Sequence, residues 1–126
     1  WGLILGTGVA ARYALEVGLE EARDRARGLA TTLREELADI PGVEVLDRGA
    51  ELAAIVTVSV EGHEPRELMQ ALRERNINTT GQDRTDAVLD YDEKGAAGAL
   101  RLSPHYYNTE EEVETAVAAL REIVED

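Results

Sequence analysis

The chain has 126 residues, of which 44% are hydrophobic, and these values are typical of a single globular domain. Its net charge of −13 argues against nucleic acid and anionic membranes as partners, and no apolar run approaches the roughly 20 residues of a membrane-spanning helix. It contains no cysteine, which excludes disulfides, thiolate metal sites and cysteine nucleophiles from this chain.

Two helices are expected near the start of the chain. Residues 3–17 place apolar side chains at helical spacing, and Gly18 then interrupts the pattern. A second, strongly amphipathic helix follows, with a buried stripe formed by Leu19, Ala22, Ala26, Leu29, Leu33, Leu37 and Ile40. Its charged face is interpreted as a solvated surface without chemistry, made of Glu20, Glu21, Arg23, Asp24, Arg27, Arg34 and Glu35. Pro41 and Gly42 end this helix.

The middle of the chain alternates between strand and helix patterns. Val43 to Val45 predicts a short strand, and residues 54–60 alternate so clearly that a second strand is expected there. Pro65 suits the first position of a short helix, and Asn76 suits the left-handed conformation that ends one.

The last third contains a strand, a long polar stretch, a strand and a helix. Residues 77–80 are predicted as a strand, and residues 81–98 as a loop, because they show no sustained period. Leu100 to Ser103 predicts the final strand. Thr109, with Glu112 three residues on, predicts a capping box that opens the last helix.

These elements predict an α+β fold. Their order is ααββαββα, and only one face of each strand is apolar enough to contact a helix layer. A two-layer sandwich is therefore expected, in which a small antiparallel or mixed sheet of three or four strands is covered by helices on one face.

Arg101 is the candidate binding residue. With a period of two, Leu100 and Leu102 point into the helix layer while Arg101 points to the opposite face. The planar guanidinium suits bidentate binding of a carboxylate. The alternative is a solvated arginine on an exposed sheet face, and the pattern alone leaves that alternative open. His63 and His105 are too far apart in sequence to form a local metal motif, so no metal is expected.

The stretch from Arg101 to Glu114, Arg-Leu-Ser-Pro-His-Tyr-Tyr-Asn-Thr followed by an acidic helix start, resembles the closing signature of class V aminotransferases. Ile40-Pro-Gly-Val and Arg75-Asn-Ile-Asn agree with the same family in order. The resemblance implies that residues 1–126 are the C-terminal small domain of an enzyme dependent on pyridoxal 5′-phosphate (PLP), of fold type I. It also implies that the large cofactor-binding domain of such an enzyme is absent from this chain.

The resemblance also implies roles for particular residues. Arg101 would bind the carboxylate of the amino-acid substrate, with His105 and Asn78 as further substrate contacts. Asn108 is expected to organise the turn before Thr109. The family's cofactor lysine belongs to the large domain. Lys94 is the only lysine here, and its acidic neighbours favour the charged ammonium. No cofactor-binding or catalytic residue is therefore expected on this fragment, which should be inactive alone.

The long loop is expected to discriminate among members of the family. The resemblance implies that cysteine desulfurases carry their nucleophilic cysteine there, and residues 83–87 contain none. The parent enzyme is therefore predicted to be a PLP-dependent aminotransferase and not a cysteine desulfurase. Epimerisation and carbon–sulfur lyase chemistry remain open. A free-standing, non-catalytic α+β binding module is the alternative from a different class.

Composition and resemblance lead to three further expectations. Arginine outnumbers lysine twelve to one, and this, with the acidic excess, favours a cytoplasmic protein of a salt-accumulating halophile, although a GC-rich genome also replaces lysine with arginine. The resemblance implies a homodimeric parent. Trp1 stands where an initiator methionine is missing, inside a helical pattern, which indicates a cut within a longer protein, although an artificially chosen start would look the same.

Overall fold

A four-stranded antiparallel sheet lies at the centre of the computed structural model, which describes residues 1–125. In chain order the elements are α1 (Gly2–Val17), α2 (Leu19–Ala38), β1 (Val43–Val45), β2 (Val56–Val60), α3 (Pro65–Glu74), β3 (Thr80–Asp83), the 3₁₀ turn η1 (Arg84–Asp86), α4 (Val88–Lys94), β4 (Gly98–Leu102) and α5 (Glu110–Glu125). The strand order is β1-β2-β4-β3.

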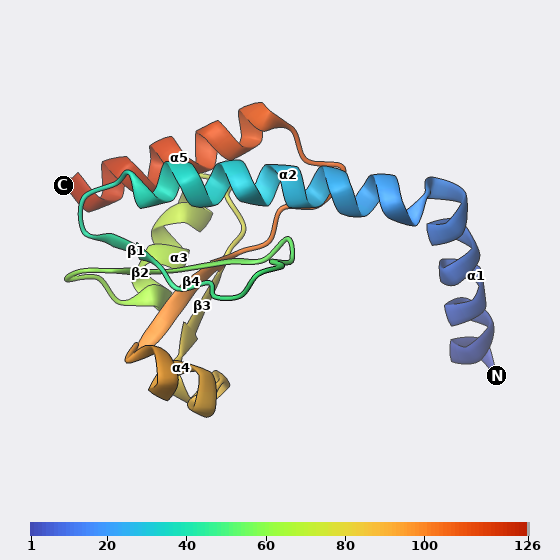
Figure 1. Ribbon diagram of the computed structural model, residues 1–126, viewed down its shortest axis with the longest axis horizontal. Helices are drawn as coiled ribbons and strands as arrows, with labels where there is room; N and C mark the ends of the chain where they lie inside the picture. The colour runs from blue at the N-terminus through green and yellow to red at the C-terminus, as the bar shows by residue number, and fades with distance from the viewer. Residues whose placement is uncertain (126) are drawn as a thin grey trace.

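Helices α2, α3 and α5 pack together on one face of this sheet (Figure 1). The core between the two layers is a single apolar cluster, to which the strands contribute Val56, Val58, Val60, Leu100 and Leu102. The helices contribute most of the stripes that their periodicity predicts, including Leu29, Leu33, Leu37, Val113, Val117 and Leu120. The expectation that Leu19 lies on the buried stripe of α2 is wrong, because its side chain is 56% exposed. The predicted two-layer α+β sandwich is confirmed, with four strands and antiparallel pairing throughout.

Helix α5 begins with the predicted capping box. The Thr109 hydroxyl accepts from the Glu112 backbone N–H (3.2 Å), and the Glu112 carboxylate accepts from the Thr109 backbone N–H (3.0 Å). The two bonds satisfy two of the donors that the first turn of a helix leaves free. Asn76 also adopts the predicted left-handed backbone, with φ of 63°, immediately after Arg75, the residue that caps α3.

The prediction of a strand over residues 77–80 is wrong, because the strand begins only at Thr80. Its position is set by its partner: Thr80 pairs with Arg101, and Asp83 with Gly98. The polar sequence Thr-Gly-Gln-Asp shows no strand alternation, so the ladder of bonds to β4 decides its conformation. Gly81 lets β3 lie against the start of α3, since a Cβ there would stand 2.5 Å from the Pro65 carbonyl oxygen.

The prediction of a loop over residues 81–98 is also wrong. Asp83 and Asp86 form a reciprocal box around η1, with the Asp83 carboxylate accepting from the Thr85 N–H and the Asp86 carboxylate accepting from the Asp83 N–H (2.9 Å each). Helix α4 follows, and Tyr91 packs with Leu46 and Ala99 in a second small cluster. Because Ala99 faces away from the main core, α4 covers one corner of the sheet face that the other helices leave free (Figure 1).

Helix α1 projects away from the rest of the molecule (Figure 1). None of its residues is buried, and its apolar side chains are open to solvent, with Leu3 90% and Leu5 68% exposed. In residues 1–125 no single helix is both long enough and apolar enough to span a membrane. Helices α1 and α2 meet these two criteria only when they are taken together, and the pair is bent by 76°.

An ion pair joins α2 to the start of α5 and predicts an acid-sensitive contact. The Arg25 guanidinium binds the Glu110 carboxylate with both terminal nitrogens, and this lowers the pKa of Glu110 from 4.5 to about 2. A carboxylate whose pKa is lower in the folded state stabilises the fold above its unfolded pKa, and the stabilisation is lost as pH falls from 4.5 towards 2.

We therefore expect Glu110→Gln to lower the melting temperature at pH 7 and to have a smaller effect at pH 3. Circular dichroism of the wild type and the variant at both pH values measures this difference. Glu111→Gln, which changes the same charge on the neighbouring residue, is the control. An equal loss for Glu110→Gln at the two pH values would contradict the expectation.

Candidate functional site

Arg101 lies near the end of β4, in the middle of the sheet. Its direct cross-strand neighbours are Thr57 on β2 and Thr80 on β3. Leu100 and Leu102, on either side of it, are buried in the core beneath the helices. Alternation along the strand therefore directs the Arg101 side chain to the opposite face, as its sequence pattern predicts.

The Arg101 guanidinium has a donor that no group in residues 1–125 satisfies. Its Nε atom is buried and lacks a hydrogen-bond partner, and no ion pair joins Arg101 to a carboxylate in the described part of the chain. An unsatisfied buried donor costs on the order of 1–3 kcal/mol. Most arginines of this acidic chain do have partners, so Arg101 is set apart as a group that can bind an additional anion.

Arg101 borders an open pocket of about 470 Å³. The pocket lies between α2, the loop that precedes β2 and the segment that follows β4. Its lining comprises Ala22, Arg23, Ala26, Ala53, Ala54, Ile55, Arg101, Ser103, Pro104, His105 and Tyr106. None of these is acidic, although the chain carries 26 acidic residues. Arg23 is already paired with Asp24 (2.8 Å), so Arg101 is the unpaired cation of the lining. The pocket therefore suits a small anion with an apolar body.

His105 lines the same pocket, as part of an aromatic cluster. Its ring stacks on Tyr107 and contacts Tyr106, with ring centroids 4.7 Å apart in both cases. The Asn108 side chain accepts from the His105 backbone N–H (2.8 Å) and donates to Glu112 (3.0 Å). The expectation that Asn108 organises this turn is confirmed. The structure thus brings His105 and Arg101 to one site.

Asn78, the other predicted contact, lines a different groove. This groove has a volume of about 540 Å³ and shares only Ser103 and Pro104 with the Arg101 pocket. The Thr79 hydroxyl oxygen beside it is buried without a hydrogen-bond partner among the described residues. Asn78 and Arg101 are therefore not brought into one pocket. The pairing of Thr80 with Arg101 leaves Asn78 beyond the end of β3, where the chain separates from β4.

Lys94 lies in neither pocket. Its ammonium pairs with the Asp90 carboxylate (2.8 Å) one turn earlier on α4. Lys94 is the only lysine of the chain, and the structure engages it in a local ion pair away from the Arg101 pocket.

The side chains of Arg34 and Asp47 are largely shielded from solvent, and the interpretation of Arg34 as a solvated residue is wrong. Their side chains are 12% and 9% exposed, and the Arg34 Nε donates to Asp47 (2.7 Å). Helical periodicity places Arg34 beside the apolar stripe, but the loop that covers it comes from elsewhere in the chain. No local signal pairs residues that lie thirteen positions apart.

The sequence model of the family described as Aminotransferase class-V matches residues 2–116. The probable cysteine desulfurase 1 of Mycobacterium leprae is 32% identical over 122 residues, which are 96% of this chain and 20% of that protein. The chain therefore spans about a fifth of the length of this relative.

Two solved structures resemble the fold. The cysteine desulfurase of Thermococcus onnurineus NA1 aligns with a TM-score of 0.83 and 26% identity, over 90% of this chain and 28% of its own. A C-DES mutant, described with glycine covalently linked to its PLP cofactor, aligns with a TM-score of 0.65 and 23% identity, over 81% of this chain and 24% of its own.

The prediction that the parent enzyme is not a cysteine desulfurase is wrong. Five curated relatives that match 94–96% of the chain are all named as cysteine desulfurases or probable cysteine desulfurases. The prediction depended on one missing side chain, whereas the similarity extends over nearly the whole sequence. The absence of cysteine remains a property of this chain, but it does not decide to which group of the family the chain is most similar.

Proposed function

The chain belongs to the class V aminotransferase family, and from this premise we propose that it is the C-terminal small domain of a PLP-dependent enzyme acting on an amino acid. The names of its relatives make L-cysteine the first candidate substrate. In this proposal the domain closes over the substrate and excludes water from it. The proposal concerns a longer enzyme, because the chain spans only a part of its relatives.

Arg101 carries the proposal, as the group that binds the substrate carboxylate. The supporting observation is its buried, unpartnered Nε beside a pocket without acidic side chains. A carboxylate in the pocket would form a charge-assisted bond with the guanidinium. His105, on the same pocket wall, is proposed as a second contact. No substrate contact is proposed for Asn78, which lines the other groove.

The large domain of the same polypeptide is the proposed partner of this chain. Helix α1 supports this, because its exposed apolar side chains form a surface that water solvates poorly. The large domain would also hold the PLP, since Lys94 is engaged by Asp90. When bound, PLP supplies an electron sink for chemistry at the amino acid. The residues of this chain orient the carboxylate and shield the site.

A carbon–sulfur lyase is the second candidate, because this chain has no cysteine and elimination needs no protein thiol. If the enzyme instead desulfurates L-cysteine, an accepting thiol must come from outside this chain. The products separate the two reactions. Elimination from L-cysteine consumes one water and releases pyruvate, ammonia and hydrogen sulfide, whereas desulfuration leaves alanine and transfers the sulfur to the accepting thiol as a persulfide.

The proposed function is tested on the full-length enzyme by its visible absorption spectrum during titration with L-cysteine and other amino acids. We expect PLP absorbance in the resting enzyme and a spectral change at saturating substrate. Lys94→Arg should leave both unchanged, since Lys94 is not assigned to the cofactor. Absence of PLP absorbance, or its loss in Lys94→Arg, would contradict the proposal.

A further inference from the structure

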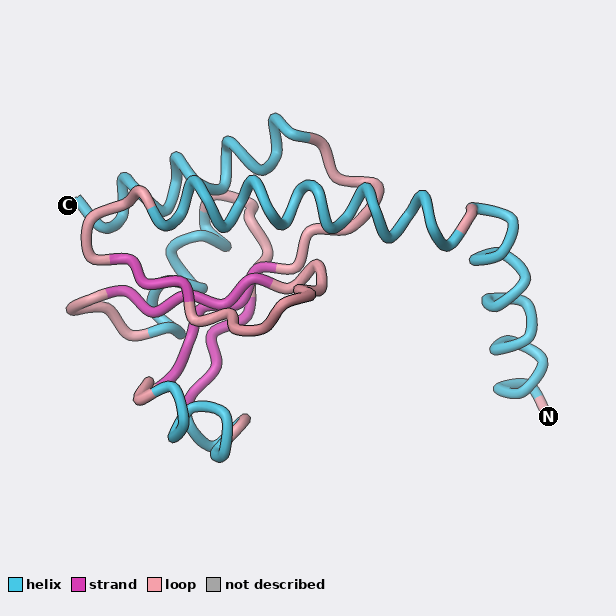
Figure 2. The backbone as a smooth tube through the Cα atoms, in the orientation of Figure 1, coloured by secondary structure: helices cyan, strands magenta, loops and turns pink. Residues whose placement is uncertain are grey.

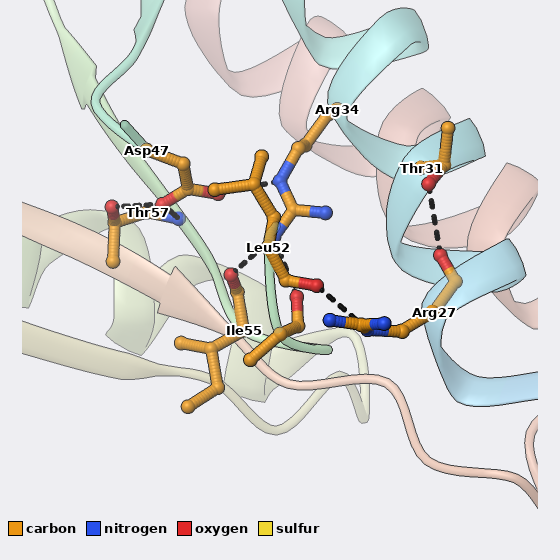
Figure 3. A network of polar contacts seen from close by, with 8 residues as sticks. Arg27, Thr31, Arg34, Asp47, Leu52, Ile55 and Thr57 are labelled. Carbon is orange, nitrogen blue, oxygen red and sulfur yellow. Dashed lines mark hydrogen bonds and ion pairs between the residues drawn. The ribbon is translucent and has the colours of Figure 1, made fainter. Parts of the chain in front are cut away.

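The loop between β1 and β2, residues 46–55, depends on arginines of α2 for its hydrogen bonds. The Arg34 guanidinium donates to the carbonyl oxygens of Ala53 and Ile55 (2.7 Å each), and the Arg27 Nε donates to that of Leu52 (3.0 Å). Figure 3 shows both arginines reaching from the helix to this loop. These bonds take the place of a strand ladder before β2, which begins only at Val56.

Asp47 joins Arg34 to β2. Its carboxylate accepts from the Arg34 Nε (2.7 Å), from the Thr57 backbone N–H (3.0 Å) and from the Thr57 hydroxyl (2.6 Å) (Figure 3). Both charged side chains are nearly buried, and buried charges are tolerated when they are paired and fully hydrogen-bonded. The side chains of Arg34, Asp47 and Thr57 therefore form a closed hydrogen-bond network, which restricts the conformation of each of them.

Both branches of this network end at the Arg101 pocket. Ala53, Ala54 and Ile55 line the pocket together with Arg101, and Thr57 is the direct cross-strand partner of Arg101. Residues opposite each other in an antiparallel pair have Cβ atoms about 4.5–5.5 Å apart. Figure 2 shows the loop before β2 and the segment after β4 at the same end of the sheet, below α2.

We propose that Arg34 and Asp47 are positioning residues for substrate binding, acting through Thr57 and the loop to preorganise the Arg101 pocket. The proposal rests on the proposed function, because it takes Arg101 as the carboxylate-binding group. Neither residue touches the substrate. Their effect is to keep one wall of the pocket, and the neighbour of Arg101, in the geometry that binding requires.

The test uses steady-state kinetics of the full-length enzyme with L-cysteine. In Thr57→Val the new side chain has nearly the shape of threonine but lacks the hydroxyl that donates to Asp47. Thr57→Ser keeps this hydroxyl. We expect Thr57→Val and Arg34→Met to raise KM by about fivefold to tenfold with kcat within about twofold, as small displacements of a positioned group do. Thr57→Ser should have the same KM as the wild type.

Arg66→Gln is the matched control, since it breaks an ion pair (Arg66–Asp83, 2.8 Å) whose members do not line the pocket. It should leave KM unchanged. The inference is overturned if Thr57→Val and Arg34→Met lower only the melting temperature and keep the wild-type KM. If Arg101→Gln also keeps the wild-type KM, the proposed function fails; if Arg101→Gln alone raises it, only the positioning role fails.

Discussion

Gly98→Ala is expected to destabilise the fold by about 3 kcal/mol or more, because the added methyl group has no space. Gly98 is buried at the start of β4, and a Cβ there would stand 2.3 Å from the Gln82 carbonyl oxygen and 3.1 Å from the Asp83 Cα. Both atoms belong to the backbone of β3, which is hydrogen-bonded to β4. The strands must separate to admit the methyl group, and the ladder that defines β3 is then lost.

Urea denaturation followed by circular dichroism measures this loss. Gly28→Ala is the matched control, because it makes the same chemical change on the exposed face of α2, where a Cβ meets nothing within 4 Å. Alanine is favoured over glycine in a helix by roughly 0.5–1 kcal/mol, so this control should be stabilised. The same substitution is thus expected to have opposite signs at the two sites. A Gly98→Ala protein as stable as the wild type would show that β3 and β4 are not packed as described.

Arg101→Gln in the full-length enzyme is expected to lower kcat/KM for L-cysteine by about 30-fold to 1000-fold. The range corresponds to the roughly 2–4 kcal/mol lost when one partner of a buried, hydrogen-bonded charge pair is removed. Glutamine keeps the length and a donor but not the charge or the two-pronged geometry. The loss should appear mainly in KM, and the cofactor absorbance should not change.

Two controls identify the carboxylate as the group that Arg101 binds. Arg101→Lys retains the charge but not the planar fork, so it should recover only a part of the lost affinity. Cysteamine, which is L-cysteine without the carboxylate, should bind the wild type and Arg101→Gln equally well. An Arg101→Gln enzyme with unchanged kcat/KM, or with weakened cysteamine binding, would contradict the assigned role.

The sequence alone predicts the parts of this fold that follow from local periodicity. The alternation of Val56 to Val60, the α2 stripe from Ala26 to Leu37 and the Thr109 capping box each place side chains relative to their own backbone, and all three are present. The strand expected over residues 54–60 begins only at Val56. The same period of two, in Leu100 and Leu102, predicts the face of the sheet on which Arg101 lies. The Arg-to-Thr signature near the end of the chain also identifies the family, which the match over residues 2–116 confirms.

Only the tertiary structure decides the conformation of residues 77–98 and the surroundings of Arg101. The segment around β3 and α4 is polar and without period, so its conformation comes from pairing with β4 and from packing of Tyr91 on Ala99. The shielding of Arg34 and Asp47 from solvent depends on which distant segments meet, and so does the lack of a partner for the Arg101 Nε within residues 1–125. Periodicity in the sequence predicts which face of a helix or strand packs against the neighbouring layer. It does not predict which charged groups pair with one another when the layers pack together.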